Sequence, residues 1–139
     1  MYVLDTDILS LVQAGHSRLG ERRGRVDPAD MAITIVTRIE VLRARFDHLL
    51  KAASGEELQR AQQWLVRSEA LLSQLAVFPV DSDAAAEFDR LRQIKALRKI
   101  GRADLLIASI TLARQAILVT RNRRHFQLIP NLRVEDWAR

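Results

Sequence analysis

The sequence predicts an α/β fold, with three layers in the order α/β/α around a central parallel sheet of about five strands. Short, continuously apolar runs alternate with longer amphipathic segments along the chain. Strands that helices cover on both faces have this composition. The 139 residues suit a single domain, and no repeat, low-complexity tract or long linker divides them. We therefore expect a single α/β domain over residues 1–139.

The first half of the sheet comes from two apolar runs near the beginning of the chain. Residues 2–4 are predicted to form a strand that stops at Asp5, and a helix follows at residues 8–12. A loop rich in Gly, Arg and Asp is expected over residues 15–30. The β-branched run at residues 31–36 predicts the second strand.

Two long helices are expected next, with no strand between them. The sequence Thr37-Arg38-Ile39-Glu40 is a capping box, which predicts that a helix opens there. A second helix is expected from about residue 56 to 75. The residues predicted to face inward are Ile39, Leu42, Phe46 and Leu49 in the first, and Leu58, Ala61, Leu65, Leu72 and Leu75 in the second. This helix pair either covers the sheet or leaves apolar surface for a partner.

The last third of the chain returns to the alternation of strands and helices. The predicted elements are an edge strand at 77–80, a helix capped by Ser82 or Asp83 that ends near 99, a helix at 102–114, a strand at 117–119, a turn at 122–126 and a short strand at 132–134. Pro79 places the first of these strands at an edge, because proline cannot donate a ladder hydrogen bond.

Composition narrows the function classes. The formal net charge is +5, which favours a polyanionic partner and above all nucleic acid. There is no cysteine, and the three histidines lack zinc-ligand spacing, so any metal would be a hard cation held by carboxylates. No run approaches the ~20 apolar residues of a membrane span. We expect a soluble, cytoplasmic protein with no membrane partner.

Three acidic residues are predicted to meet at one edge of the sheet. Asp5 ends the first strand, Glu40 lies just past the second, and Asp104 lies in the first turn of a mostly apolar helix. Ligands of open parallel sheets bind beyond the carboxyl ends of the strands, which is where these residues fall. Each of them also has a purely structural interpretation as a helix cap, as does Asp7.

Carboxylates brought together raise each other's pKa, and a divalent cation removes that conflict. Mg²⁺ takes a few carboxylates plus water and can promote phosphodiester hydrolysis. Thr120 could orient a carboxylate by a hydrogen bond, and Asn122 could offer its amide oxygen to a metal or its waters, although both residue types also favour turns. The candidate catalytic residues are Asp5, Glu40, Asp104 and Asn122, supported by Thr6, Asp7 and Thr120.

The segments that hold these residues resemble the PIN-domain nucleases, and among them the VapC-type toxins of bacterial toxin–antitoxin pairs. The resembling segments are Tyr2-Val3-Leu4-Asp5-Thr6-Asp7, residues 35–42, residues 101–108, residues 118–126 and the ending at residues 132–137. Together they span essentially the whole chain in the family's order. The resemblance implies a parallel sheet of about five strands and an RNA endonuclease that uses Mg²⁺ or Mn²⁺.

The resemblance also implies roles for individual residues and for partners. Asp5 and Asp104 would bind the metal, Glu40 would be the third acid, and Thr120 would be the supporting hydroxyl. Many PIN domains have a fourth acid where this chain has Asn122, so we expect one metal in the resting site. The family also implies homodimers and a cognate antitoxin, in some cases in a higher complex, with the helices between residues 37 and 75 as its docking surface.

Basic residues beside the proposed centre are the expected contacts to substrate phosphates. They are Arg98, Lys99, Arg102, Arg121, Arg123 and Arg124, with His125 next to them. Aromatic residues make up only 5% of the chain, which limits stacking along an extended single strand. A folded RNA, either transfer RNA or ribosomal RNA, is therefore the expected substrate.

Other functions fit parts of the sequence. A PIN-like module without activity would only bind RNA or a partner, and the absent fourth acid favours it. A phosphoacceptor receiver domain could use Asp81 as its acceptor, but it needs a lysine after the fifth strand, which is missing here. A helix-turn-helix DNA-binding domain would leave the strands unexplained.

Overall fold

A computed structural model describes residues 1–139, and its centre is one five-stranded sheet in the order β3-β2-β1-β4-β5. Every neighbouring pair of strands is parallel. The strands are β1 (Tyr2–Leu4), β2 (Met31–Thr34), β3 (Ala76–Phe78), β4 (Ile117–Val119) and β5 (Arg133–Glu135). The predicted α/β/α fold with a five-stranded parallel sheet is confirmed, as is the placement of β3 at an edge.

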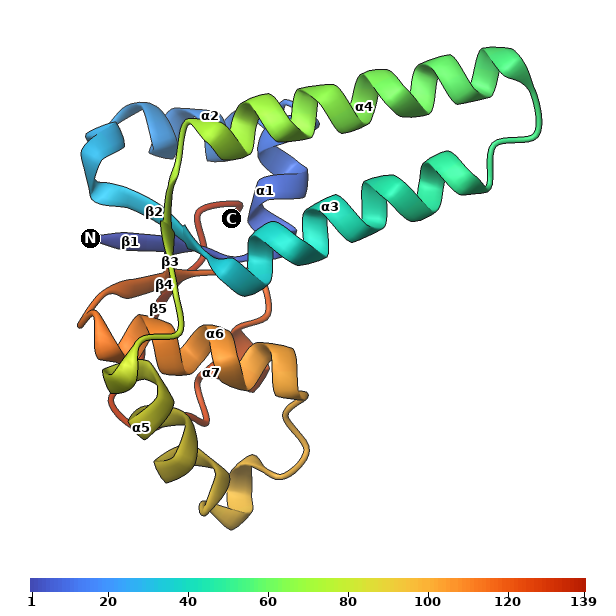
Figure 1. The fold of residues 1–139 in the computed structure, drawn as a ribbon. Coiled ribbons are helices and arrows are strands. Elements are labelled where there is room, and N and C mark those ends of the chain that lie inside the picture. Colours follow the sequence, from blue (N-terminus) through green and yellow to red (C-terminus); the bar gives the residue numbers. More distant parts are fainter.

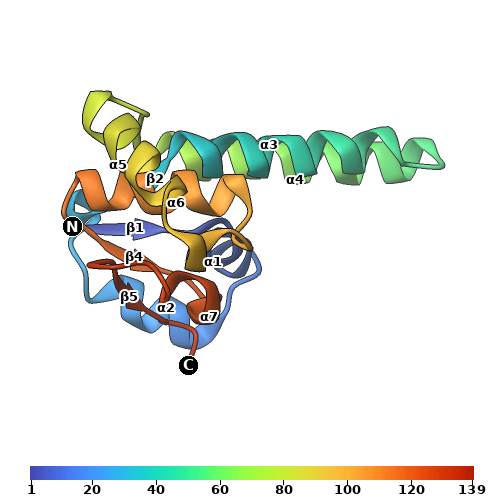
Figure 2. The same cartoon turned by 90° about the horizontal axis from the view of Figure 1, so that it is seen from below.

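Helices cover both faces of the sheet (Figures 1 and 2). They are α1 (Thr6–Gln13), α2 (Ser17–Gly24), α3 (Ile35–Leu50), α4 (Gly55–Ser73), α5 (Ser82–Arg92), α6 (Arg102–Ala113) and α7 (Arg123–Phe126), with short 3₁₀ turns η1 (Pro28–Asp30) and η2 (Lys95–Leu97). None of these helices is both long and apolar enough to cross a membrane.

Two apolar cores lie on the two faces of the sheet, because side chains alternate along each strand. Val3 and Leu118 belong to the core that α5 and α6 complete. Leu4 and Val119, one residue further along, belong to the core that α1 to α4 complete. Both faces of β1 and β4 are therefore dry, which explains why these strands have no polar alternation.

The predicted loop over residues 15–30 is wrong in part, because helix α2 occupies its first half. The side chain of His16 accepts a hydrogen bond from the Leu19 amide at 3.3 Å and caps this helix. Leu19 is fully buried, whereas the rest of α2 is polar. A helix docked by one leucine has no apolar periodicity, so the sequence pattern could not reveal it.

The predicted start of α3 is also wrong. Strand β2 ends at Thr34, and the Oγ1 atom of Thr34 accepts the hydrogen bond from the Thr37 amide at 3.1 Å. Thr34 is thus the N-cap, and Glu40 lies in the second turn rather than in a capping box. A threonine can cap a helix at either position, and the sequence has one at 34 and one at 37, so the sequence alone did not distinguish the two starts.

The inward face of α3 differs from the predicted one. Thr37 and Val41 are the buried residues of this helix, whereas the side chains of Ile39 and Phe46 remain 49% and 52% exposed. On α4 the buried residues are Ala61, Ser68 and Leu72. The two helices form a hairpin whose outer part extends away from the sheet (Figures 1 and 2), so only its inner part covers the core.

The helix before α6 is shorter than predicted. Helix α5 ends at Arg92 instead of near residue 99, and η2 follows it. Its N-cap is Asp81, whose carboxylate accepts the Ala84 amide at 2.9 Å, rather than Ser82 or Asp83. The strand order β3-β2-β1-β4-β5 excludes the receiver-domain alternative, because that fold has the order 2-1-3-4-5.

Candidate active site

The candidate site lies between the carboxyl ends of β1 and β4, where the order of the strands in the sheet reverses. Leu4 pairs with Val119, so the next residue of each strand, Asp5 and Thr120, reaches the same edge. The Thr120 hydroxyl donates to Asp5 Oδ2 at 2.7 Å, and the Thr6 amide donates to Asp5 Oδ1 at 2.8 Å. Asp5 is thus the N-cap of α1, and it is also the carboxylate that Thr120, expected to orient one by a hydrogen bond, contacts.

Asp5 is buried, with 6% of its surface exposed. Burial raises its pKa to about 6, against the lowering effect of the hydrogen bonds from Thr120 and Thr6. The carboxylates of Asp7 and Asp104 make smaller contributions to this raised pKa. Asp104 thus affects the pKa of Asp5 although the two residues are almost a hundred positions apart in the sequence, and their sharing of one metal ion stays a prediction.

Glu40 is connected to Asp5 through Thr6. The Thr6 hydroxyl donates to Glu40 Oε1 at 2.8 Å and lies 3.1 Å from the hydroxyl of Thr37, while the amide of Thr6 binds Asp5. The supporting role predicted for Thr6 is consistent with this arrangement, since one residue orients two of the three acids. Glu40 does not fold back on its own helix, because its carboxylate faces α1.

Asp104, the third residue of α6, has a side chain that is 32% exposed. Its Oδ2 atom lies 3.8 Å from Nδ1 of His125, and that nitrogen lies 3.0 Å from the side-chain nitrogen of Asn122. The backbone amide of Asn122 also donates a hydrogen bond to the hydroxyl oxygen of Thr120 at 3.0 Å. His125 therefore contacts both Asp104 and Asn122. The contact between His125 and Asp104 has no signal in the sequence.

Asp7 contacts the segment that follows β4. Its Oδ2 atom accepts a hydrogen bond from the Arg121 amide at 3.2 Å, and its Oδ1 atom is buried without a hydrogen-bond partner. Burial raises the pKa of Asp7, and the carboxylate of Asp136 adds to that effect. Asp7 is not the cap of α1, so of its two predicted roles the supporting one remains.

A hard cation at this edge of the sheet would be held by carboxylate oxygens. No group of three Asp, Glu or His side chains lies close enough to hold one ion together, so Asp5, Glu40 and Asp104 do not converge as three direct ligands. Mg²⁺ is commonly held by one or two carboxylates and several waters. The buried carboxylate of Asp5, with its raised pKa and the charge of Asp104 beside it, fits a cation of this kind.

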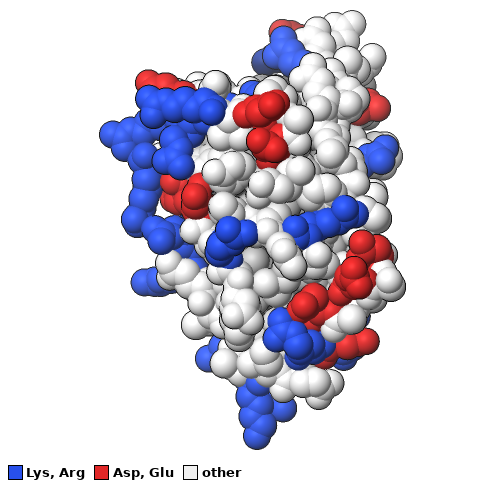
Figure 3. Space-filling view, turned by 90° about the vertical axis from the view of Figure 1, so that its left-hand side faces the viewer, with Lys and Arg blue, Asp and Glu red and all other residues white.

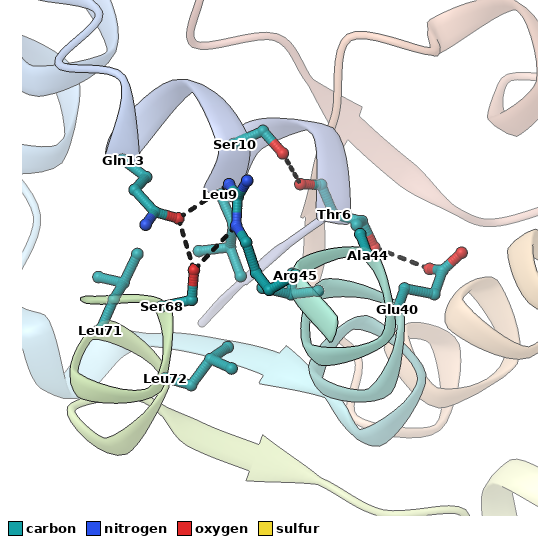
Figure 4. Close-up of a pocket in the computed structure, with 11 residues that line it drawn as sticks. Thr6, Leu9, Ser10, Gln13, Glu40, Ala44, Arg45, Ser68, Leu71 and Leu72 are labelled. Carbon is teal, nitrogen blue, oxygen red and sulfur yellow. Dashed lines mark hydrogen bonds between the residues drawn. The ribbon is translucent and has the colours of Figure 1, made fainter. Parts of the chain in front are cut away.

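A cavity of about 110 Å³ adjoins the site between α1, α3 and α4 (Figure 4). Thr6 and Glu40 line one end. At the other end the Ser68 hydroxyl donates to Gln13 Oε1 at 2.9 Å, and Arg45 donates to the same oxygen at 3.2 Å and to Ser68 Oγ at 3.1 Å. This polar cluster ties both helices of the hairpin to α1. Its members are scattered along the chain, so nothing in the sequence identifies it.

The predicted phosphate contacts fall into two groups. Arg121, Arg123 and Arg124 lie on and just before α7, and Arg98, Lys99 and Arg102 lie at the entry to α6. All are exposed except Arg123, which is partly buried. Basic side chains also gather on the side of the molecule that carries the amino ends of the strands (Figure 3). Positive charge is therefore not confined to the edge with the acids.

Several curated proteins resemble the chain over nearly its full length. It is 27% identical to the "tRNA(fMet)-specific endonuclease VapC" of Shigella flexneri, over 99% of this chain and 98% of that one. It is also 27% identical to "Ribonuclease VapC1" of Haemophilus influenzae strain R2866, over 100% and 99% of the two chains.

Solved structures resemble it in the same way. A chain of the DNA-bound VapBC complex from Salmonella typhimurium superimposes with a TM-score of 0.80 at 27% identity, over 98% of this chain and 97% of the other. A chain of VapBC2 from Rickettsia felis superimposes with a TM-score of 0.75 at 26% identity, over 98% of both. Residues 2–131 match the PIN domain family. The chain, with its parallel sheet and its acids at the β1–β4 edge, therefore belongs to the PIN domain family.

Proposed function

We propose that the chain is a metal-dependent endoribonuclease, the toxin of a VapBC-type toxin–antitoxin pair, and that it hydrolyses RNA phosphodiester bonds. The observation that carries this proposal is the buried Asp5, held by Thr120 from the neighbouring strand and raised in pKa by burial and nearby acids. The two relatives named as VapC nucleases, which match almost the whole chain, support it.

Asp5 and Asp104 are the proposed ligands of Mg²⁺ or Mn²⁺. Such an ion, when bound, lowers the pKa of water and stabilises negative charge that develops on a phosphate. The hydroxyl of Thr120 and the amide of Thr6 hold the two oxygens of Asp5, so its side chain is oriented before any ligand arrives. Asp104 is the more exposed of the pair, since its side chain is 32% exposed whereas Asp5 is buried.

Glu40 is proposed to orient the attacking water and accept its proton. One of its oxygens is bound by the Thr6 hydroxyl at 2.8 Å, which leaves the other free to accept a hydrogen bond from water. Attack on phosphorus in line with the leaving O3′ breaks the P–O3′ bond. The products would carry 5′-phosphate and 3′-hydroxyl ends.

The substrate is proposed to be a folded RNA, with transfer RNA tested first and ribosomal RNA second. One relative is named for its action on a tRNA. The basic residues at the entry to α6 and around α7 lie on either side of Asp104 in the sequence and would bind phosphates there.

The proposed protein partners are a cognate antitoxin and a second copy of the chain. The α3–α4 hairpin carries five exposed apolar residues along its length, Ile39, Phe46, Leu50, Leu58 and Val66. An exposed apolar surface of this kind is typical of a docking site, and we assign it to the antitoxin. The solved neighbours are themselves described as VapBC complexes.

The proposal is tested with the chain co-expressed with its neighbouring gene, purified and freed from any partner. We expect cleavage of tRNA that needs Mg²⁺ or Mn²⁺, stops with a chelator and is lost in Asp5→Asn and Asp104→Asn. Asp83→Asn is the matched control, because Asp83 is exposed in the first turn of α5. Full activity of either site variant would overturn the assignment. RNA binding without cleavage would favour the inactive-module alternative.

A further inference from the structure

A second hollow, of about 210 Å³, lies between α5, η2 and the beginning of α6. Its floor is apolar and consists of buried side chains, among them Leu91, Leu97 and Leu105. Its rim carries three arginines, Arg92, Arg98 and Arg102. We name this hollow with its three arginines the arginine pocket.

The three arginines have no acidic partner. None of them forms an ion pair, whereas two arginines nearby do: Arg90 with Glu87 at 2.6 Å, and Arg114 with Asp81 at 3.7 Å. Three like charges around one hollow repel one another, and an anion bound between them would remove the repulsion. The apolar floor offers no such charge from within the protein.

Phe88 organises two of the three arginines. The guanidinium carbon of Arg92 lies 5.5 Å from the ring centroid, and that of Arg102 lies 5.8 Å from it. These distances are within the range of cation–π attraction. A guanidinium that rests on a ring keeps its N–H donors in its own plane, where they can bind the oxygens of a phosphate in pairs.

The arginine pocket lies beside the candidate active site. Arg102 is the first residue of α6 and Asp104 is the third, so one helix turn contributes to both. The chain returns from η2 to the beginning of α6 at the same edge of the sheet where β1 leads into α1 (Figures 1 and 2). The basic group of Figure 3 lies on the opposite side, toward the amino ends of the strands.

We propose that the arginine pocket binds a backbone phosphate of the RNA substrate next to the cut, with Arg92 and Arg102 held in place by Phe88. This inference rests on the proposed nuclease function and adds a binding subsite to it. It assigns substrate contact to Arg92, which the sequence did not suggest, and groups it with Arg98 and Arg102. It also gives Phe88 a positioning role.

The test measures binding of labelled tRNA to the full-length protein by fluorescence anisotropy, in EDTA so that no cleavage occurs, at several salt concentrations. The variants are Arg92→Gln and Arg98→Gln. The matched control is Arg90→Gln, which removes the same charge from α5 but at an arginine already paired with Glu87. All three side chains are exposed, so the fold should persist, and melting curves check this.

We expect Arg92→Gln and Arg98→Gln each to weaken binding roughly threefold to tenfold. The slope of log affinity against log salt should fall by about one unit per lost phosphate contact. Phe88→Leu keeps all charges, so it should lower affinity with little change in that slope. Arg90→Gln should bind like the unmodified protein.

The pocket and the nuclease proposal can fail separately. If the protein cleaves tRNA while Arg92→Gln and Arg98→Gln bind like Arg90→Gln, the arginine pocket is not a subsite and the nuclease proposal stands. If the variants lose affinity but the unmodified protein never cleaves RNA with Mg²⁺ or Mn²⁺, the subsite stands and the nuclease proposal falls. If the unmodified protein neither binds RNA in EDTA nor cleaves it with Mg²⁺ or Mn²⁺, both are overturned.

Discussion

The hydroxyl of Thr120 lies 2.7 Å from Oδ2 of Asp5 and joins the ends of β1 and β4 where the sheet order reverses. Both residues are buried, so the hydrogen bond is shielded from water. It holds a carboxylate that burial alone would tend to protonate. This contact is the reason that an acid so poorly solvated can remain oriented toward the open edge.

The first prediction concerns stability and pH in the absence of metal. Because the pKa of Asp5 is raised from 3.8 to about 6 in the fold, the folded state binds more protons than the unfolded state between these values. The contribution of Asp5 to stability is therefore greatest below pH 3.8, falls as pH rises through this window and levels off above pH 6. A shift of this size corresponds to about 3 kcal/mol at most.

Asp5→Asn cannot titrate, so its unfolding free energy relative to the unmodified protein should rise between about pH 4 and pH 7. Urea unfolding of both proteins in EDTA at a series of pH values measures this difference and cancels the titration of all other groups. A difference that stays constant with pH would contradict the raised pKa of Asp5.

The second prediction concerns metal. If Asp5 and Asp104 share a divalent cation, Mg²⁺ or Mn²⁺ should raise the melting temperature of the unmodified protein, because a ligand that binds only the folded state stabilises it. At a hundred times the dissociation constant the gain is about 2.7 kcal/mol. The gain should vanish in Asp5→Asn and Asp104→Asn and persist in Asp83→Asn, as measured by thermal melts with added Mg²⁺. Equal stabilisation of all four proteins would argue against this pair as ligands.

The third prediction concerns Thr120. Thr120→Val has nearly the same shape but loses the donor to Asp5 and the acceptor for the Asn122 amide. We expect a loss of about 1–3 kcal/mol in unfolding free energy, since buried polar groups lose their partner. The pKa of Asp5 should rise, so RNA cleavage should require a higher pH. Thr120→Ser keeps the hydroxyl and should restore both properties, and an unchanged pH profile of cleavage in Thr120→Val would refute the orienting role.

The fourth prediction concerns the hairpin. The side chains of Ile39 and Phe46 are 49% and 52% exposed, so Ile39→Ser and Phe46→Ser should leave the melting temperature nearly unchanged. Both should weaken binding of the co-expressed antitoxin while RNA cleavage by the free protein persists. Leu128→Ser is the control, because Leu128 is 56% exposed but lies after α7, outside the hairpin. Calorimetric titration measures the affinity of each variant for the antitoxin, and Leu128→Ser should bind like the unmodified protein. Equal affinities of Leu128→Ser and the hairpin variants would contradict the assignment.

Strands were the best predicted elements. The bounds of β1 and β4 agree with the apolar runs at 2–4 and 117–119, because a strand buried on both faces admits no polar residue. The same pattern placed Asp5 and Thr120 at strand ends, and the structure shows that they meet there. Both residues come directly after parallel strands, and a parallel sheet aligns the carboxyl ends of its strands at one edge.

Helix faces and helix ends were predicted less well. Apolar spacing placed Ile39 and Phe46 inside, but the structure buries Thr37 and Val41 instead. A helix that protrudes from its domain carries apolar residues for a partner as well as for its own core, and spacing cannot separate the two. Helix α2 was missed for the opposite reason, since Leu19 alone anchors it.

Short sequence patterns, in which an apolar run is followed by an acid or a hydroxyl, were sufficient to infer the parallel sheet. They also placed Asp5 and Thr120 at the ends of its strands. Only the tertiary structure decided that Thr6 links Asp5 to Glu40, that Asp104 faces His125, and that three unpaired arginines surround one hollow beside α6. The physical reason is that these contacts depend on how the helices rotate and pack against the sheet. That rotation minimises the free energy of the whole core and is not encoded by any one segment.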